Sequence, residues 1–165
     1  MSTSLPTIYP VGYAGTTADF LHTKLTRSGD MRLQTGTVAL PAATATSTLI
    51  GLIPFNKGMK LCMGGSSVYS DDLDTSTNVT FNIGYTYYDS TTGTSNASGF
   101  VAGTTVPQSS GMIPFTASSG SSVGMTWTAA ADGWITITNT AATTTTGNVL
   151  FNLAFAYDPS GVTNP

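Results

Sequence analysis

The chain has 165 residues, of which 40% are hydrophobic, 10% are aromatic and only 8% are charged, with a formal net charge of −3. It contains no Glu, one His and one Cys, against 31 Thr, 18 Ser and 18 Gly. This hydrophobic content excludes a disordered chain, and a single cysteine excludes an intramolecular disulfide. So few titratable side chains disfavour an enzyme, whereas Thr, Gly and aromatic residues favour β-strands and tight turns.

The first 27 residues predict an extended N-terminal arm rather than a helix or a regular strand. Two prolines and two glycines fall within its first 15 residues, and they interrupt both kinds of element. Three aromatic residues are interleaved with them, namely Tyr9, Tyr13 and Phe20. The arm either folds back on its own domain or lies on a neighbouring subunit. Residues 17–25 are the one candidate helix, with Thr17 as its cap.

Residues 28–165 predict a single domain built from short β-strands. Residues 31–39 begin the pattern, with Met31, Leu33 and Thr35 on one parity, and residues 49–53 and 59–63 form further strands around a turn at Lys57-Gly58. Gly64-Gly65 ends the third strand. Residues 79–87 and 149–157 alternate most regularly, which is typical of half-buried strands.

The remaining segments predict loops and one hairpin. Residues 89–122 are rich in Ser, Thr and Gly and are expected to form surface loops with short strands. Asp132-Gly133 lies between possible strands at residues 123–128 and 134–138, which favours a hairpin. Several strands at roughly ten-residue spacing predict an all-β fold, a jelly-roll-like β-sandwich with an extended N-terminal arm.

The charges are distributed unevenly along the chain. All five bases lie between positions 24 and 60, so residues 1–60 carry +3, whereas residues 61–165 hold six Asp and no base and carry −6. Five spread bases are too few for a nucleic-acid footprint, and a contact with an acidic protein partner fits better. Scattered solvated charge is the alternative. No apolar stretch of about 18 residues and no signal-like N-terminus is present, so neither a membrane partner nor secretion is expected.

Few groups could perform chemistry. Asp71, Asp72 and Asp74 could hold Ca²⁺ through their oxygens, or could instead cap turns in a solvated loop. His22 has no second ligand for a transition metal, and Cys62 is expected to be a small core residue between Leu61 and Met63. The sequence therefore predicts no catalytic residue, no cofactor, no metal and no small-molecule substrate.

Two tryptophans, Trp127 and Trp134, flank the predicted hairpin turn. On an exposed sandwich face such side chains, together with tyrosines, would stack on carbohydrate, whereas buried ones belong to the core. Trp127 shares parity with Val123 and Met125, which favours the core. The tyrosines in question are Tyr85, Tyr87 and Tyr88.

From about Leu33 to Tyr157 the chain resembles the small β-sandwich head proteins of tailed phages known as decoration or cement proteins. The motifs that carry the resemblance are Ile53-Pro54, Lys57-Gly58-Met59-Lys60, Asp71-Asp72-Leu73-Asp74, Thr80-Phe81-Asn82-Ile83-Gly84-Tyr85 and the closing segment from Gly147-Asn148-Val149 to Tyr157. The resemblance implies a virion structural protein on the outer surface of an icosahedral capsid, made in the host cytoplasm. It implies a homotrimer at local threefold axes, bound to the major capsid protein, with no enzymatic residues.

On this hypothesis the arm attaches the protein to the capsid or to a neighbouring subunit. Aromatic side chains act as anchors and basic side chains steer association. The partner-binding residues are Tyr9, Tyr13, Phe20, Lys24, Arg27 and Arg32. The alternative function is a carbohydrate-binding or receptor-binding module of a virion fibre or tail.

Overall fold

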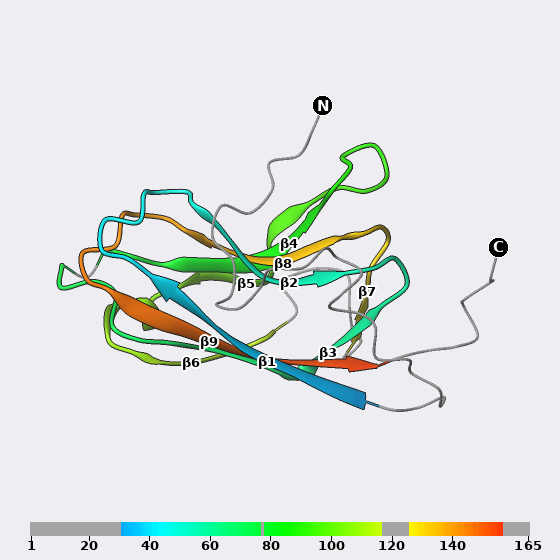
Figure 1. The fold of residues 1–165 in the computed structure, drawn as a ribbon, viewed down its shortest axis with the longest axis horizontal. Coiled ribbons are helices and arrows are strands. Elements are labelled where there is room, and N and C mark those ends of the chain that lie inside the picture. The colour runs from blue at the N-terminus through cyan, green and yellow to red at the C-terminus, as the bar shows by residue number, and fades with distance from the viewer. Residues whose placement is uncertain (1–30, 77, 117–125, 157–165) are drawn as a thin grey trace.

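The computed structural model describes residues 31–76, 78–116 and 126–156, which form nine β-strands and one short 3-10 turn (Figure 1). The strands are β1 (Met31–Leu40), β2 (Leu49–Phe55), β3 (Lys60–Ser70), β4 (Phe81–Tyr87), β5 (Asn96–Thr104), β6 (Gly111–Pro114), β7 (Thr126–Thr128), β8 (Gly133–Asn139) and β9 (Gly147–Ala156), and the turn is η1 (Val106–Gln108). Within these described ranges no helix has the length and apolar character needed to cross a membrane. The predicted arm and its candidate helix lie outside the described residues.

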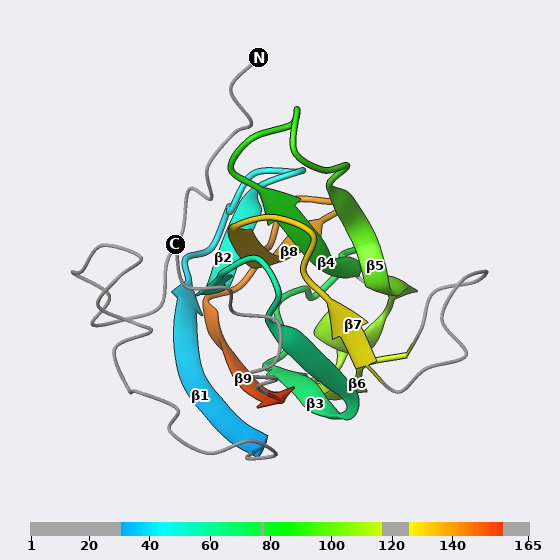
Figure 2. The ribbon, with the colours of Figure 1, turned by 90° about the vertical axis from the view of Figure 1, so that its right-hand side faces the viewer.

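The strands form two antiparallel sheets packed face to face (Figure 2). One sheet has the order β1-β9-β3-β6, with β7 also paired to β3, and the other has the order β2-β8-β4-β5. The pairings are nested along the chain, because β4 pairs with β5, β3 with β6, β2 with β8 and β1 with β9. This order arises when a long antiparallel ribbon is rolled up, so that β9 pairs with β3 and β8 pairs with β4. The fold is therefore a jelly-roll sandwich, which confirms the predicted fold class.

The core lies between the sheets and follows the clearest alternations of the sequence. On β9 the inward side chains are Val149, Phe151, Leu153 and Phe155, all at most 5% exposed. Inward residues of β4 behave in the same way, since Phe81 and Ile83 are fully buried. Each such side chain stabilises the fold by roughly 1.5–3 kcal/mol through its removal from water.

The inward face of β1 is not the one on which the sequence pattern was noted. Leu33 is 59% exposed, whereas Val38 and Leu40 on the opposite parity are buried. The cause is the register with β9, in which Val38 lies opposite the inward residue Val149. Residues directly opposite each other in an antiparallel pair share a face, so the even positions of β1 turn inward.

Strand β3 does not end at Gly64-Gly65, as the sequence suggested. It continues to Ser70 through an irregularity in its register with β9 between Cys62 and Ser67. The Ser66 hydroxyl bridges the irregularity by donating to the Cys62 carbonyl at 2.7 Å, and it accepts from the Ala154 amide at 3.0 Å. Cys62 is half-buried rather than a core residue, because Leu61 and Met63 take the inward parity.

The predicted hairpin around Asp132-Gly133 is also wrong. Strand β7 pairs with β3, where Trp127 lies opposite Leu61, whereas β8 lies between β2 and β4 in the other sheet. The chain between them therefore crosses from one sheet to the other. Asp132 anchors this crossing by accepting a hydrogen bond from the Lys57 amide at 2.7 Å. The expected loop region from residue 89 also contains a nine-residue strand, β5.

Candidate interaction surface

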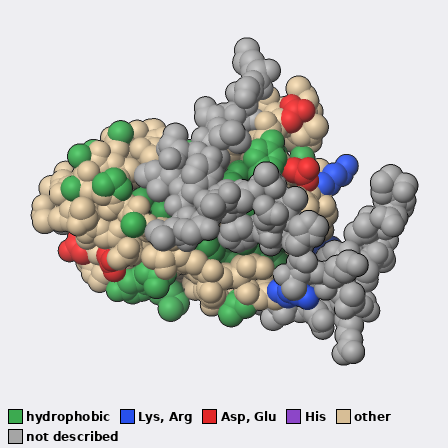
Figure 3. Space-filling view, viewed as in Figure 1, with side chains coloured by type: hydrophobic (Ala, Val, Ile, Leu, Met, Phe, Trp, Pro, Cys, Tyr) green, Lys and Arg blue, Asp and Glu red, His purple; other side chains and the backbone are tan. Residues whose placement is uncertain are grey.

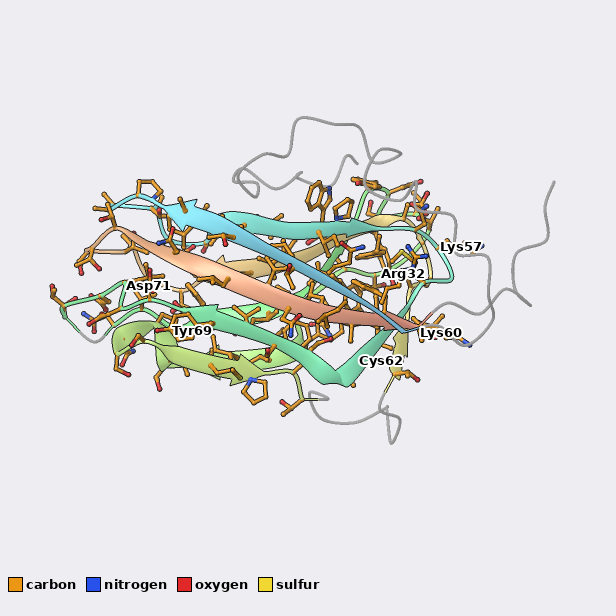
Figure 4. The ribbon with its side chains drawn as sticks, turned by 60° about the horizontal axis from the view of Figure 1, so that its bottom comes forward. Arg32, Lys57, Lys60, Cys62, Tyr69 and Asp71 are labelled. Atoms are coloured by element: carbon orange, nitrogen blue, oxygen red, sulfur yellow. The ribbon has the colours of Figure 1, made fainter. Side chains whose placement is uncertain are left out.

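Of the six predicted partner-binding residues, the structure describes one. Arg32 is half-buried near the start of β1, and Tyr9, Tyr13, Phe20, Lys24 and Arg27 lie outside the described residues. Figure 4 shows Arg32, Lys57 and Lys60 toward the same end of the sandwich, with Asp71 at the opposite end. The bases of the described part are thus gathered at one end of the sandwich. The sequence showed that they are close along the chain, but not that they are close in the fold.

The buried carboxylate of Asp74 organises the acidic loop between β3 and β4. It accepts from the Ser76 amide at 2.9 Å, the Ser76 hydroxyl at 2.6 Å, the Val79 amide at 2.7 Å and the Asn78 amide. Thr144 Oγ1 donates to it from the neighbouring loop at 3.1 Å. These donors, the Ser76 hydroxyl first, hold the pKa of Asp74 well below its usual range.

The other two acidic side chains of this loop are also used as caps. Asp71 Oδ2 accepts from the Asn148 amide at 2.7 Å and from its side-chain nitrogen at 3.2 Å. Asp72 Oδ1 accepts from the Asp74 amide at 3.1 Å. Within the described ranges no group of three or more His, Cys, Asp or Glu side chains could hold a metal ion. The loop therefore follows the turn-cap alternative of the sequence analysis.

Most of the aromatic side chains that could have formed a sugar platform are buried or packed against the core, whereas Tyr88 is half-buried and lines a surface hollow. Trp127 lies against Tyr85, Phe55 and Phe100, with ring centroids 4.7, 5.2 and 5.3 Å away. Trp134 and Tyr87 are each 3% exposed. Burial raises the pKa of Tyr87, whose hydroxyl accepts a hydrogen bond from the Ala130 amide at 3.2 Å.

A hollow of about 470 Å³ lies beside this aromatic end, lined by Lys57, Tyr88, Asp89, Thr92 and residues 130–132. Both of its carboxylates are engaged within the fold. Asp132 binds the Lys57 amide, and Asp89 accepts from the Thr91 amide at 2.8 Å and from its hydroxyl at 2.7 Å. Those bonds from Thr91 lower the pKa of Asp89. The polar groups of this hollow thus serve to fix its loops.

The outer face of the β1-β9-β3-β6 sheet is the surface that sequence reasoning missed. It carries the exposed large hydrophobic residues of the described part, which are Leu33, Tyr69, Met112 and Leu150 at 59%, 39%, 66% and 42% exposure. Figure 3 shows hydrophobic side chains along the bottom of the molecule, where this sheet lies. Neighbouring exposed apolar side chains of this kind mark an interaction site.

The registers of three strand pairs align part of this face into one row. Leu150 lies opposite Thr37 on β1 and Tyr69 on β3, and Tyr69 lies opposite Met112 on β6. A hollow of about 410 Å³ opens beside the row, lined by Thr35, Gly36, Thr37, Ser67, Tyr69, Met112, Leu150, Phe151 and Asn152. The face therefore combines protruding aliphatic and aromatic groups with a recess lined by both apolar and small polar side chains.

Comparison with known proteins gives a structural likeness and no sequence family. No family model and no curated protein matches the chain. The fold matches two phage capsid structures. The first, described as the cyanophage Pam1 capsid asymmetric unit, contains a chain with 22% identity and a TM-score of 0.58, over 87% of this chain and 98% of that chain. The second, the capsid of Ralstonia phage GP4, gives 19% identity and a TM-score of 0.59, over 79% and 86%. At these identities the likeness shows a shared fold.

Proposed function

We propose that this chain is a virion structural protein that decorates and stabilises the outer surface of a tailed-phage capsid by binding the major capsid protein. The observation that carries the proposal is the match with the Pam1 capsid chain, which is covered over 98% of its length. Nearly the whole of a chain seen in a capsid thus has the architecture of this one. The likeness to the GP4 capsid structure supports the same role independently.

The side chains of the described region agree with a structural role rather than with catalysis. The most strongly perturbed carboxylate, Asp74, is buried and saturated with hydrogen-bond donors, so it is not available as a general acid or base. Exposed apolar groups are gathered on one sheet face, as expected for a protein that works by contact.

The N-terminal arm is proposed as the attachment to the capsid or to a neighbouring subunit, in a homotrimer at local threefold positions. Its aromatic residues would fill pockets on the partner, and its bases would steer association. Arg32 supports this proposal, since it lies toward the same end of the sandwich as Lys57 and Lys60. A clamp across capsomer joints adds interface area and so resists the outward strain of a DNA-filled head.

Co-sedimentation of the purified protein with expanded empty capsids of the source phage tests the function. We expect saturable binding at a fixed ratio to the major capsid protein, with three copies per local threefold position. Absence of binding by the folded protein would overturn the decoration role. Binding of soluble glycans in its place would establish the fibre or tail alternative.

Variants of the arm and of the bases test the attachment. Deletion of residues 2–20 should abolish sedimentation with capsids while leaving the urea midpoint unchanged, and retained binding would contradict the role of the arm. Replacing Lys24, Arg27 and Arg32 with Ala should slow association and weaken its salt dependence. Replacing Lys57 and Lys60 with Ala, at the same end of the sandwich but outside the predicted set, should slow association less.

A further inference from the structure

The outer face of the β1-β9-β3-β6 sheet is almost free of charge. Among the outward positions of its strands in the described part, one side chain is charged. It is Lys60, which lies at one end of the sheet. The positions between are occupied by Thr, Asn, Ser, Ala and Cys around the exposed Leu33, Leu150, Tyr69 and Met112. A partner of this face therefore needs no counter-charge, and a charged partner would lose solvation without compensation.

The row across this face is self-complementary. It runs Thr37, Leu150, Tyr69, Met112 from β1 through β9 and β3 to β6. If a second copy stacks on it with aligned strands and a twofold axis along them, β9 of one copy covers β3 of the other. Leu150 then packs on the Tyr69 ring of the second copy. The most exposed of these side chains, Met112, meets Thr37 at the margin of the recess.

The next row across this face is polar. Asn152 lies opposite Thr35 on β1 and Ser67 on β3, so small polar side chains stand beside the apolar row. Under the same twofold axis, Ser67 of the second copy faces Asn152. The polar row of one copy therefore meets the polar row of the other, as the apolar rows do.

We infer that this face binds a second copy of the same chain through an isologous, twofold contact. Strands β1, β9 and β3 have 10, 10 and 11 residues and β6 has 4. At a rise of about 3.4 Å per residue and a strand spacing of about 4.8 Å, the face measures about 600 Å² per copy. The total of about 1,200 Å² is at the lower limit for a specific interface and fits reversible association. The contact would join two single chains in solution, or two trimers if the threefold contact also forms. It does not depend on capsid binding.

Sedimentation velocity of the full chain, from about 1 µM to about 500 µM, tests the inference, because this range spans the Kd of a weak interface. We expect the mass to double with concentration. Leu150→Asp should raise the Kd at least tenfold and return the smaller species. The matched control is Ala102→Asp, which places the same charge on an exposed position of β5 in the other sheet and should leave the doubling unchanged.

Each other result overturns the inference. A mass that does not change over the range excludes the contact, and a doubling that Leu150→Asp leaves intact assigns association to another surface. If Leu150→Asp instead abolishes sedimentation with capsids in a protein that shows no doubling, the face contacts the shell. Equal urea midpoints for Leu150→Asp and Ala102→Asp show that both variants are folded, as expected since Leu150 is 42% exposed.

Discussion

At one end of the sandwich, aromatic rings from both sheets pack on one another, whereas at the opposite end a buried carboxylate gathers hydrogen bonds from two loops. Phe55 and Tyr87 meet edge to face at 5.9 Å, and Trp127 lies within 5.3 Å of three other rings. Asp74, 1% exposed, is instead surrounded by amides and hydroxyls. Contacts between rings do not depend on pH, whereas a carboxylate loses its charge and its accepted hydrogen bonds when it is protonated. The two ends should therefore respond differently to substitution and to pH.

The largest effect is expected at the aromatic end. Phe55 is fully buried, so Phe55→Ala removes ring contacts with Tyr87 and Trp127 and leaves a cavity. We expect a loss of about 3–5 kcal/mol in the free energy of unfolding, measured by urea denaturation. Phe55→Leu, the milder control, should lose about 1.5 kcal/mol or less. A loss below about 1 kcal/mol for the alanine variant would show that the rings contribute little. The loss should be the same at neutral and acidic pH.

A matched pair of glycines compares how tightly the two ends are packed. At the aromatic end, a Cβ on Gly133 would lie 2.2 Å from the Thr86 carbonyl oxygen and 2.9 Å from Phe55 Cζ. At the acidic end, a Cβ on Gly147 would lie 2.7 Å from Leu73 Cδ2, the end of a flexible side chain. We expect Gly133→Ala to cost about 3 kcal/mol and Gly147→Ala about 1 kcal/mol in thermal unfolding. Equal costs would contradict the conclusion that the aromatic end is packed more tightly around its glycine.

Much of this architecture could be predicted from local pattern. The alternation in β4 and β9 succeeded because both are central strands whose inward face is apolar throughout. It failed in β1, an edge strand whose inward positions include Arg32, Gln34 and Gly36, so the apolar odd positions were misleading. Asp132-Gly133 indicated a turn, but a turn does not reveal that the next strand joins the other sheet. Strand partners are chosen by contacts distant in sequence.

The interaction surface was less accessible to sequence reasoning for the same reason. Its row joins positions 37, 150, 69 and 112, which only the registers of four strands bring together. The acidic loop was the opposite case, because Asp74 binds residues two to five positions away, a separation at which caps can be foreseen.

Acidification should weaken the end that holds Asp74 more than the aromatic end. The pKa of Asp74 is lowered in the folded protein, so below the ordinary value of 3.8 the unfolded chain binds more protons than the native one. The stabilisation that the Asp74 carboxylate gives to the folded state is complete above that pH and is lost as the pH falls further. Asp74→Asn should lower the urea midpoint at neutral pH and flatten its decline in acid. Asp89→Asn is the milder control at the other end, since the pKa of this exposed carboxylate is also lowered, chiefly by hydrogen bonds from Thr91. A parallel decline in wild type and Asp74→Asn would contradict the assignment.

The last comparison is between two adjacent threonine hydroxyls of one loop, of which the second should have the smallest effect. Thr143, 2% exposed, accepts from the Thr44 amide at 3.0 Å and donates to the Pro41 carbonyl at 3.0 Å. Exposed Thr144 accepts from the Thr75 amide at 2.9 Å and donates to Asp74. Water can replace the second hydroxyl but not the first. Thr143→Val should therefore lose about 2 kcal/mol in urea denaturation, and Thr144→Val about 0.5 kcal/mol. A larger loss for Thr144→Val than for Thr143→Val would mean that a hydrogen bond to the charged Asp74 stabilises this end more than a buried hydroxyl does.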